Sequence, residues 1–246
     1  IKSKDPSLTP EKISEILLFS VDDIDEQNSA YVGKLGTGRI NASLALGSDL
    51  ISGAGYLGKL ATAPAVYFID GRGERHLFSN EATYWSWHQG AWTDQDIKVI
   101  SQAEFDSLAV GRNITVRPGT NLVRFENSPR VYAVGVNQVI YHLTEERARQ
   151  LFGDNFGKRA VIIQNAFETD YRRASQWTDS PYPSGSLISY INSDKVYYLE
   201  GQIKRLVTPE SFVANNFNRN YVISDVSVDF IYQTGLDLGT LSAYEI

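Results

Sequence analysis

The sequence repeats itself with a fixed period, and this constrains the fold more than any other feature. A Val-Tyr pair opens an apolar segment at Val66–Ile69, again at Val131–Val134 and again at Val196–Leu199. The second segment begins 65 residues after the first, and the third begins 65 residues after the second. Self-similarity at a constant spacing of this length is typical of tandem structural units. Most of the chain is therefore expected to be an array of three units.

Each unit has the residue pattern of a β-hairpin followed by a helix. A polar, glycine-containing turn follows each Val-Tyr segment, which predicts that the chain folds back as a second strand. The returning strands carry His76, His142 and Arg205, and we predict that these three residues occupy one structural position. One hydroxyl residue suited to cap a helix follows each returning strand: Ser79, Thr144 and Thr208. An acid lies in the first turn after each of them, where the helix dipole favours a negative charge.

More elements are expected after each of these helices. Apolar segments that read as buried strands lie at 97–100, 160–163 and 221–223, and a short helix is predicted over 102–108. The predicted fold class is α+β, a helical segment followed by three tandem hairpin-plus-helix repeats of about 65 residues each. We place the repeats at 65–127, 128–192 and 193–238, the start of a fourth repeat at 239–246, and a Gly/Ser/Ala-rich linker at 47–64.

The first 46 residues have a different character from the repeats. Thr9-Pro10-Glu11 is a helix start, because it offers a hydroxyl cap, a proline at the first helical position and an acid. An apolar stripe at helical spacing follows, made of Ile13, Ile16, Leu17, Val21 and Ile24. A second helix is expected after Gly36–Gly38, with Ile40 and Ala42 among its residues.

Three ordered motifs in this stretch resemble the end of a subtilisin-like serine protease catalytic domain. They are Lys2–Pro6, Leu8–Ile13 and Gly36–Ala42, which stand in the family's order. The resemblance implies a parent that is a secreted endopeptidase using an Asp, a His and a Ser. None of the matching catalytic positions lies in this sequence, so no catalytic residue is assigned and the chain alone is expected to be inactive. Whether the parent is an enzyme stays uncertain.

The chain begins without a methionine, which suggests an internal piece of a longer protein. The repeats resemble those appended to secreted bacterial peptidases and other envelope proteins, which implies an extracellular or cell-surface location. A formal net charge of −6 argues against a nucleic-acid partner. No apolar run approaches the roughly 18 residues of a membrane-spanning helix, so no membrane insertion is expected.

One cluster of aromatic residues suggests a binding surface in the first repeat. It consists of Tyr84, Trp85, Trp87 and Trp92. Tryptophans with one exposed face often bind carbohydrates and peptides, because an indole offers both apolar area and a polar N–H. Trp85 and Trp87 are two apart on a predicted helix, so they point to different faces and at least one is expected in the core.

Neither a metal site nor a cofactor is predicted for this chain. Arg205, which cannot bind a metal, stands where His76 and His142 stand, so a long polar side chain beside the hairpin explains all three. Calcium stays open for the parent protease, although Asp22–Glu26 lacks the spacing of a calcium loop.

The leading functional hypothesis is that the chain is the C-terminal part of a secreted subtilisin-like endopeptidase. Most of it would be a non-catalytic repeat array that attaches the enzyme to a cell-envelope polymer or to a protein substrate. The alternative is a structural or adhesive surface protein without protease activity.

Overall fold

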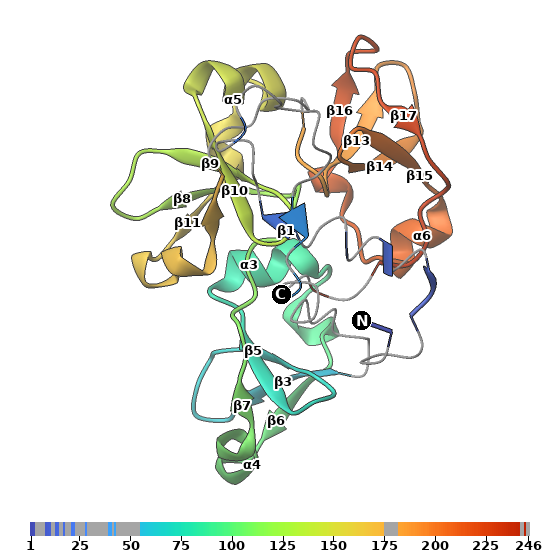
Figure 1. Cartoon of the computed structure of the whole chain (residues 1–246). Helices are drawn as coiled ribbons and strands as arrows, with labels where there is room; N and C mark the ends of the chain where they lie inside the picture. Colours follow the sequence, from blue (N-terminus) through green and yellow to red (C-terminus); the bar gives the residue numbers. More distant parts are fainter. Residues whose placement is uncertain are drawn as a thin grey trace. The chain divides into compact units, whose positions relative to one another are not determined.

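In the computed structural model of this chain, residues 55–174, 182–241 and 244 are described, together with scattered residues before position 43 (1, 2, 8–10, 13, 14, 17, 21, 22, 28, 39, 40 and 42). The chain divides into two compact units, Ile1–Leu50 and Ile51–Ile246. Figure 1 traces the whole chain and labels its strands and helices.

Few residues of the first unit are described, and they partly agree with the sequence pattern. Pro10 is helical and the Ile13 N–H donates to the Thr9 carbonyl at 3.0 Å, which confirms the helix start. Val21 and Ile40, however, were predicted to be helical and instead pair across two short antiparallel strands. These strands are β1 (Val21–Asp22) and β2 (Arg39–Ile40). Both residues are β-branched, and such side chains favour extended backbone. Ile16 and Ile24 lie outside the described residues.

The second unit contains three five-stranded sheets, which we call modules 1, 2 and 3. Module 1 has β3 (Tyr56–Leu60), β4 (Tyr67–Ile69), β5 (Glu74–Leu77), β6 (Ile97–Ile100) and β7 (Ala109–Val110). Module 2 has β8 (Leu122–Phe125), β9 (Val131–Val134), β10 (Val139–Leu143), β11 (Ala160–Ile163) and β12 (Arg172–Arg173). Module 3 has β13 (Leu187–Tyr190), β14 (Val196–Glu200), β15 (Ile203–Val207), β16 (Ile223–Val226) and β17 (Gln233–Thr234).

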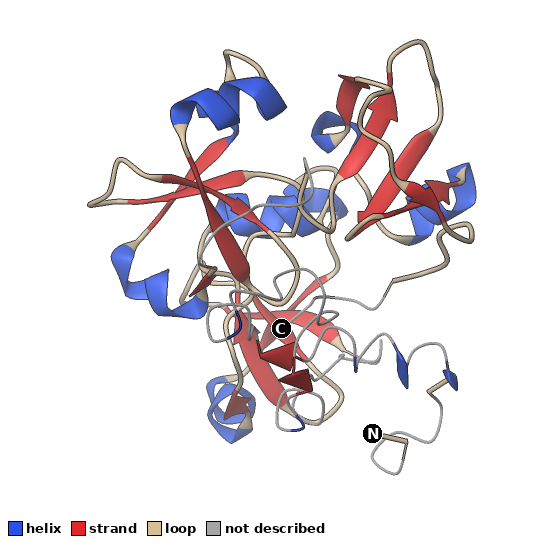
Figure 2. Ribbon diagram, turned by 45° about the horizontal axis from the view of Figure 1, so that its top comes forward, coloured by secondary structure: helices blue, strands red, loops and turns tan. Residues whose placement is uncertain are grey.

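All three sheets have the same topology. The first three strands form an antiparallel meander, as in β3, β4 and β5. The fourth strand pairs parallel to the first, and the fifth pairs parallel to the third. The fourth and fifth strands therefore form the two edges of each sheet, and the strands of these sheets are drawn in red in Figure 2.

A helix follows the third strand of each sheet, and further helical turns connect the later strands. The helices after the third strand are α3 (Glu81–Trp87), α5 (Glu145–Phe152) and α6 (Pro209–Ala214). Single 3₁₀ turns precede the fourth strands: η2 (Trp92–Asp94), η3 (Phe156–Arg159) and η5 (Arg219–Tyr221). Between the fourth and fifth strands lie α4 (Gln102–Ser107) in module 1 and η4 (Asn165–Asp170) in module 2. In the described part of the chain, no helix combines the length and hydropathy needed to cross a bilayer.

The predicted fold class was wrong, because the repeated unit is a mixed sheet and not a hairpin with helices beside it. The strands that follow the helices return to the sheet and pair parallel at its edges. The fourth strands were expected to be buried, yet Val99 of β6 is 61% exposed and Ile162 of β11 is 52% exposed. β6 and β11 are edge strands, so a neighbouring strand covers them on one side only. β3 lies within residues 47–64, the stretch interpreted as a linker, and pairs with both β4 and β6.

The helix caps agree with the sequence in two modules out of three. Thr144 and Thr208 accept hydrogen bonds from the backbone N–H groups of Arg147 and Ser211, which confirms both as N-caps. In module 1 the prediction of Ser79 was wrong, because Asn80 accepts the bond from Thr83. Asparagine is as good a cap as serine, so the two neighbouring residues could not be separated by propensity.

A buried arginine joins module 1 to module 3 within the second unit. Arg117 lies in the segment between β7 and β8, and its guanidinium donates to the backbone carbonyls of Asn215 and Asn216 at 2.9 and 3.2 Å. The same group lies over the rings of Trp87 and Phe217, with its carbon 5.1 and 4.5 Å from their centroids. A planar guanidinium can make both kinds of contact at once. The two modules are therefore packed against each other.

Candidate functional site

The aromatic cluster predicted in the first repeat is organised by α3. Its cap at Asn80 fixes where the helix begins, so the side chains of Tyr84 and Trp87 fall on the buried face. Their exposed fractions are 1% and 8%. Trp85 lies between them in sequence and is half-buried on the outer side of the helix. Trp92 comes from η2, after the helix has ended, and is 43% exposed.

Trp85 and Trp92 form an aromatic platform on module 1. Their ring centroids lie 4.6 Å apart, and Trp92 is stacked on Tyr84 with 4.7 Å between centroids. Both indole N–H groups donate to the same carboxylate oxygen of Glu81, at 3.2 and 3.3 Å. Shared anchoring of this kind restricts the rotation of both indoles. The platform is therefore held in place before any ligand arrives.

The other two residues of the predicted site serve the core. The Trp87 indole donates to the Thr115 carbonyl at 2.8 Å, and its ring lies 5.4 Å from that of Tyr244. The Tyr84 hydroxyl donates to Gln95 at 2.9 Å, and burial raises the pKa of this hydroxyl to about 12. Both are satisfied inside the module. The structure thus brings Tyr84, Trp85 and Trp92 together, and it buries Trp87 in the core on the same face of the helix as Tyr84.

A partly buried histidine lies next to this cluster. His88 stacks on Tyr84 with 4.2 Å between ring centroids, and its Nε2 accepts a hydrogen bond from the Tyr244 hydroxyl at 2.8 Å. Burial, together with the positive charge of Arg117, lowers the pKa of His88 to about 4. His88 is therefore neutral near pH 7, which suits its role as the acceptor of this bond.

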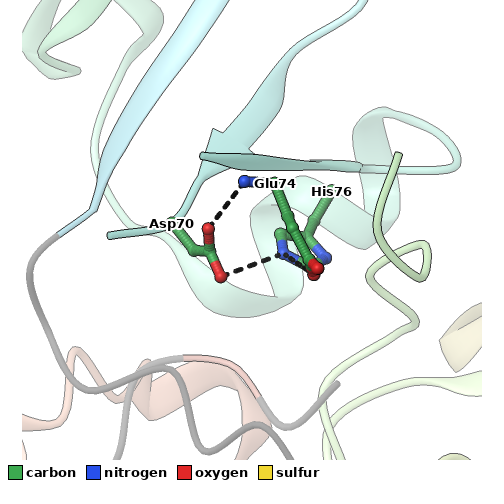
Figure 3. A group of neighbouring side chains, drawn as sticks. All are labelled: Asp70, Glu74 and His76. Atoms are coloured by element: carbon green, nitrogen blue, oxygen red, sulfur yellow. Dashed lines mark hydrogen bonds and ion pairs between the residues drawn. The ribbon is translucent and has the colours of Figure 1, made fainter. Parts of the chain in front are cut away.

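A second group of polar side chains meets at the end of the β4–β5 hairpin of module 1 (Figure 3). Asp70 follows β4, while Glu74 and His76 lie two apart on β5 and so share one face. One ligand-type atom from each residue lies within 4.8 Å of the others. Asp70 also accepts the backbone N–H groups of Arg72 and Glu74, at 3.0 and 2.8 Å, which fixes its carboxylate in the turn.

Sequence reasoning missed this grouping because it compared His76 only with His142 and Arg205. The acids sit six and two residues before His76, across a tight turn, and a hairpin register would have brought them together. We predicted no metal site, and Asp70 and Glu74 were not among the candidate residues. Within the described residues, these are the three that could hold a metal ion.

The predicted equivalence of His142 with His76 and Arg205 was wrong. His76 lies opposite Phe68, two residues after Val66, and Arg205 lies opposite Tyr198, two residues after Val196. In module 2 the corresponding residue is Tyr141, which lies opposite Ala133, whereas His142 is one position further along. A shift of one residue in a strand turns the side chain to the other face. His142 is accordingly exposed, while His76 is 1% exposed.

Comparisons with known proteins do not identify a family for this chain. No protein-family model matches the chain, and no curated protein sequence matches it significantly. The solved structures with a weak similarity include two ESX-5 assemblies. One is the periplasmic assembly from the ESX-5 inner membrane complex, at 12% identity and a TM-score of 0.22, covering 78% of this chain and 68% of that one. The other is an intact ESX-5 inner membrane complex, at 11% identity and a TM-score of 0.23, covering 78% and 59%. At these TM-scores the similarity carries no argument about the fold or the function.

Proposed function

We propose that the three modules form a non-catalytic array that attaches a longer secreted protein to a polysaccharide of the cell envelope. The single observation that supports this is the Trp85–Trp92 platform. The Trp92 indole is 43% exposed although it stacks on Tyr84 and lies beside Trp85, so part of its apolar surface is open to a ligand. The C–H groups on one face of a sugar ring pack well against such a surface. A platform of this kind binds without reacting.

The platform is a feature of module 1 alone among the three helices that follow a third strand. The residue five positions after the N-cap is Trp85 in α3, Arg149 in α5 and Val213 in α6. In α5 the arginine pairs with Glu145 at 2.7 Å, as Trp85 pairs with Glu81 at the same spacing. The scaffold therefore accepts different side chains here, and the tryptophan is not needed to build the helix.

The nature of the parent protein is a separate part of this proposal. The motifs of residues 1–46 favour a subtilisin-like endopeptidase that acts outside the cell, with the array serving for attachment. The alternative is an adhesive surface protein without protease activity, in which the array plays the same role. A protein substrate is the other ligand class that a tryptophan surface would suit. The sequence upstream of Ile1 separates the two parents, because a protease must carry its catalytic serine there.

Co-sedimentation with insoluble peptidoglycan tests the polysaccharide proposal. Trp92→Ala should weaken retention at least 10-fold, because it removes the exposed ring and leaves Tyr84 in the core. Ile231→Ala is the matched control, since Ile231 is an apolar side chain of module 3 with 85% exposure. It should bind as the wild type does. Equal retention of the wild type and Trp92→Ala would contradict the proposal, as would binding to immobilised casein in place of peptidoglycan.

A further inference from the structure

His76 presents a lone pair to two carboxylates inside module 1. Its Nδ1 lies 2.8 Å from the backbone carbonyl of Arg112. A carbonyl oxygen only accepts hydrogen bonds, so Nδ1 carries the proton and Nε2 of the neutral ring is unprotonated. Nε2 lies 3.8 Å from Asp70 Oδ2 and 4.0 Å from Glu74 Oε2, and it is buried without a hydrogen-bond partner.

This arrangement is electrostatically incomplete. Three electron-rich atoms face one another, and two of them belong to acidic groups. Arg72 compensates part of the charge, because its guanidinium lies 2.9 Å from Asp70 and 3.5 Å from Glu74. The Arg72 side chain is 42% exposed and can turn toward solvent. A proton on Nε2 would reach neither carboxylate at hydrogen-bond distance. A metal ion would bond all three atoms at once.

We propose that module 1 binds a divalent transition-metal ion of the zinc type through His76 Nε2 and the carboxylates of Asp70 and Glu74. Zinc accepts imidazole nitrogen and carboxylate oxygen at about 2.0–2.2 Å, which places neighbouring ligand atoms about 3.3–3.5 Å apart in a tetrahedron. The separations of 3.8 and 4.0 Å need to shorten by about half an ångström. The Glu74 side chain is 35% exposed and has the freedom to move. Water can take the fourth position on that side.

The chemistry of the ligands selects the class of ion. Calcium and magnesium prefer oxygen ligands alone, whereas imidazole suits zinc, cobalt and related ions. The bond from Nδ1 to the Arg112 carbonyl is the outer contact that commonly orients a metal-binding histidine. It fixes the ring with Nε2 toward the acids. The site therefore has both the ligands and the support that such an ion requires.

The other modules carry no such set at the corresponding positions. Module 3 has Glu200 in place of Asp70 and Arg205 in place of His76, and the two are joined by a salt bridge of 2.9 Å. Module 2 has Gly135 and Tyr141 there. Arginine cannot ligate a metal. In module 3 the Arg205–Glu200 salt bridge thus occupies the place of the proposed ion. His76→Arg copies this arrangement and is used in the test below.

The test uses the tag-free chain, stripped with EDTA and titrated with ZnCl₂ by calorimetry and with CoCl₂ by absorption. We expect one ion per chain and the visible bands of a low-symmetry cobalt site. His76→Arg, which copies module 3, should abolish the saturable site, and Glu74→Gln should weaken it at least 10-fold. Arg72→Ala should bind more tightly, because the competing guanidinium is gone. His142→Ala is the control and should bind as the wild type does.

Two results would overturn the proposal. One is the absence of saturable zinc or cobalt binding by the wild type. The other is binding that persists unchanged in both His76→Arg and Glu74→Gln, since it would then come from elsewhere on the chain. Glu74→Gln changes one partly exposed oxygen, so its result does not depend on whether the arginine variant folds.

Discussion

His76 and Arg205 are structural equivalents in two modules whose sequences differ at this point. Each lies opposite the third residue of its Val-Tyr segment. His76 Nδ1 donates to the Arg112 carbonyl at 2.8 Å, and Arg205 Nε donates to the Leu236 carbonyl at 3.2 Å. These carbonyls occupy the same place, two residues after the end of the fifth strand. One position therefore fastens the last strand to the hairpin in both modules.

The first prediction concerns the stability of this connection in the metal-free chain. His76→Ala should lower the free energy of unfolding by about 1–3 kcal/mol, because the part-buried hydrogen bond to the Arg112 carbonyl is lost. His76→Arg should cost less than His76→Ala, because the guanidinium can donate to the same carbonyl and pair with Asp70. Urea unfolding in EDTA measures both. An arginine variant that is less stable than the alanine variant would show that the two modules do not share this role.

The second prediction concerns the contact between modules 1 and 3. Arg117→Ala should lower the free energy of unfolding by about 2–4 kcal/mol, because two backbone carbonyls lose their donors and two aromatic rings lose a neighbour. Arg117→Lys should recover only part of this, since an ammonium lacks the planar fork. Arg112→Ala, at an exposed position nearby, is the control. If the unfolding free energies of Arg117→Ala and the wild type agree within about 0.5 kcal/mol, Arg117 does not stabilise the contact between modules 1 and 3.

The third prediction is a loss of stability in acid that depends on His88. Its pKa is about 4 in the folded chain and near 6.5 when unfolded, so between these values the unfolded chain binds the extra proton. The free energy of unfolding should therefore fall as the pH decreases from about 6.5 to 4, by up to about 3 kcal/mol. His88→Phe copies Phe152, the last residue of α5, which lies eight residues after its N-cap as His88 does after Asn80, and it should remove this part of the slope.

The comparison of the two pH profiles is the measurement for this prediction. The phenylalanine variant leaves the Tyr244 hydroxyl without its acceptor, so it should be less stable than the wild type near pH 7. The difference between the two proteins should then narrow toward pH 4. Parallel profiles over this range would contradict the assignment of the slope to His88.

The sequence predicted the repeated hairpin and most of the helices, because those elements carry strong local signals. The Val-Tyr segments are apolar and form the central strands β4, β9 and β14, and Thr144 and Thr208 cap helices as expected. The fifth strands were not predictable in this way, whereas fourth strands were expected at 97–100 and 160–163 and lie there as β6 and β11. Strands such as Ala109–Val110 and Arg172–Arg173 have two residues each and show no periodicity. Their pairing is decided by tertiary contacts, so the mixed sheet was missed.

For the candidate sites, too, the sequence predicted what depends on neighbouring residues and missed what depends on contacts between distant segments. Clustered tryptophans are visible in the sequence, but only the structure separates the outward Trp85 and Trp92 from the buried Trp87. His142 lies 66 residues after His76, one more than the repeat period, whereas Tyr141 lies 65 residues after it and occupies the equivalent place in a hairpin of the same register. A displacement of one residue along a strand puts the side chain on the other face of the sheet, and the match in residue type concealed this.

The binding of Trp85→Arg to peptidoglycan, measured beside that of the wild type, tests the account most directly. The variant copies module 2, where Arg149 pairs with Glu145, so α3 should keep its helix and the chain its unfolding midpoint. It removes one of the two platform rings, and its guanidinium also competes for the Glu81 carboxylate that anchors Trp92. We predict an unchanged urea midpoint and a dissociation constant at least 10-fold higher than that of the wild type. A dissociation constant equal to the wild-type value, in a variant that is equally stable, would contradict the attachment role of module 1.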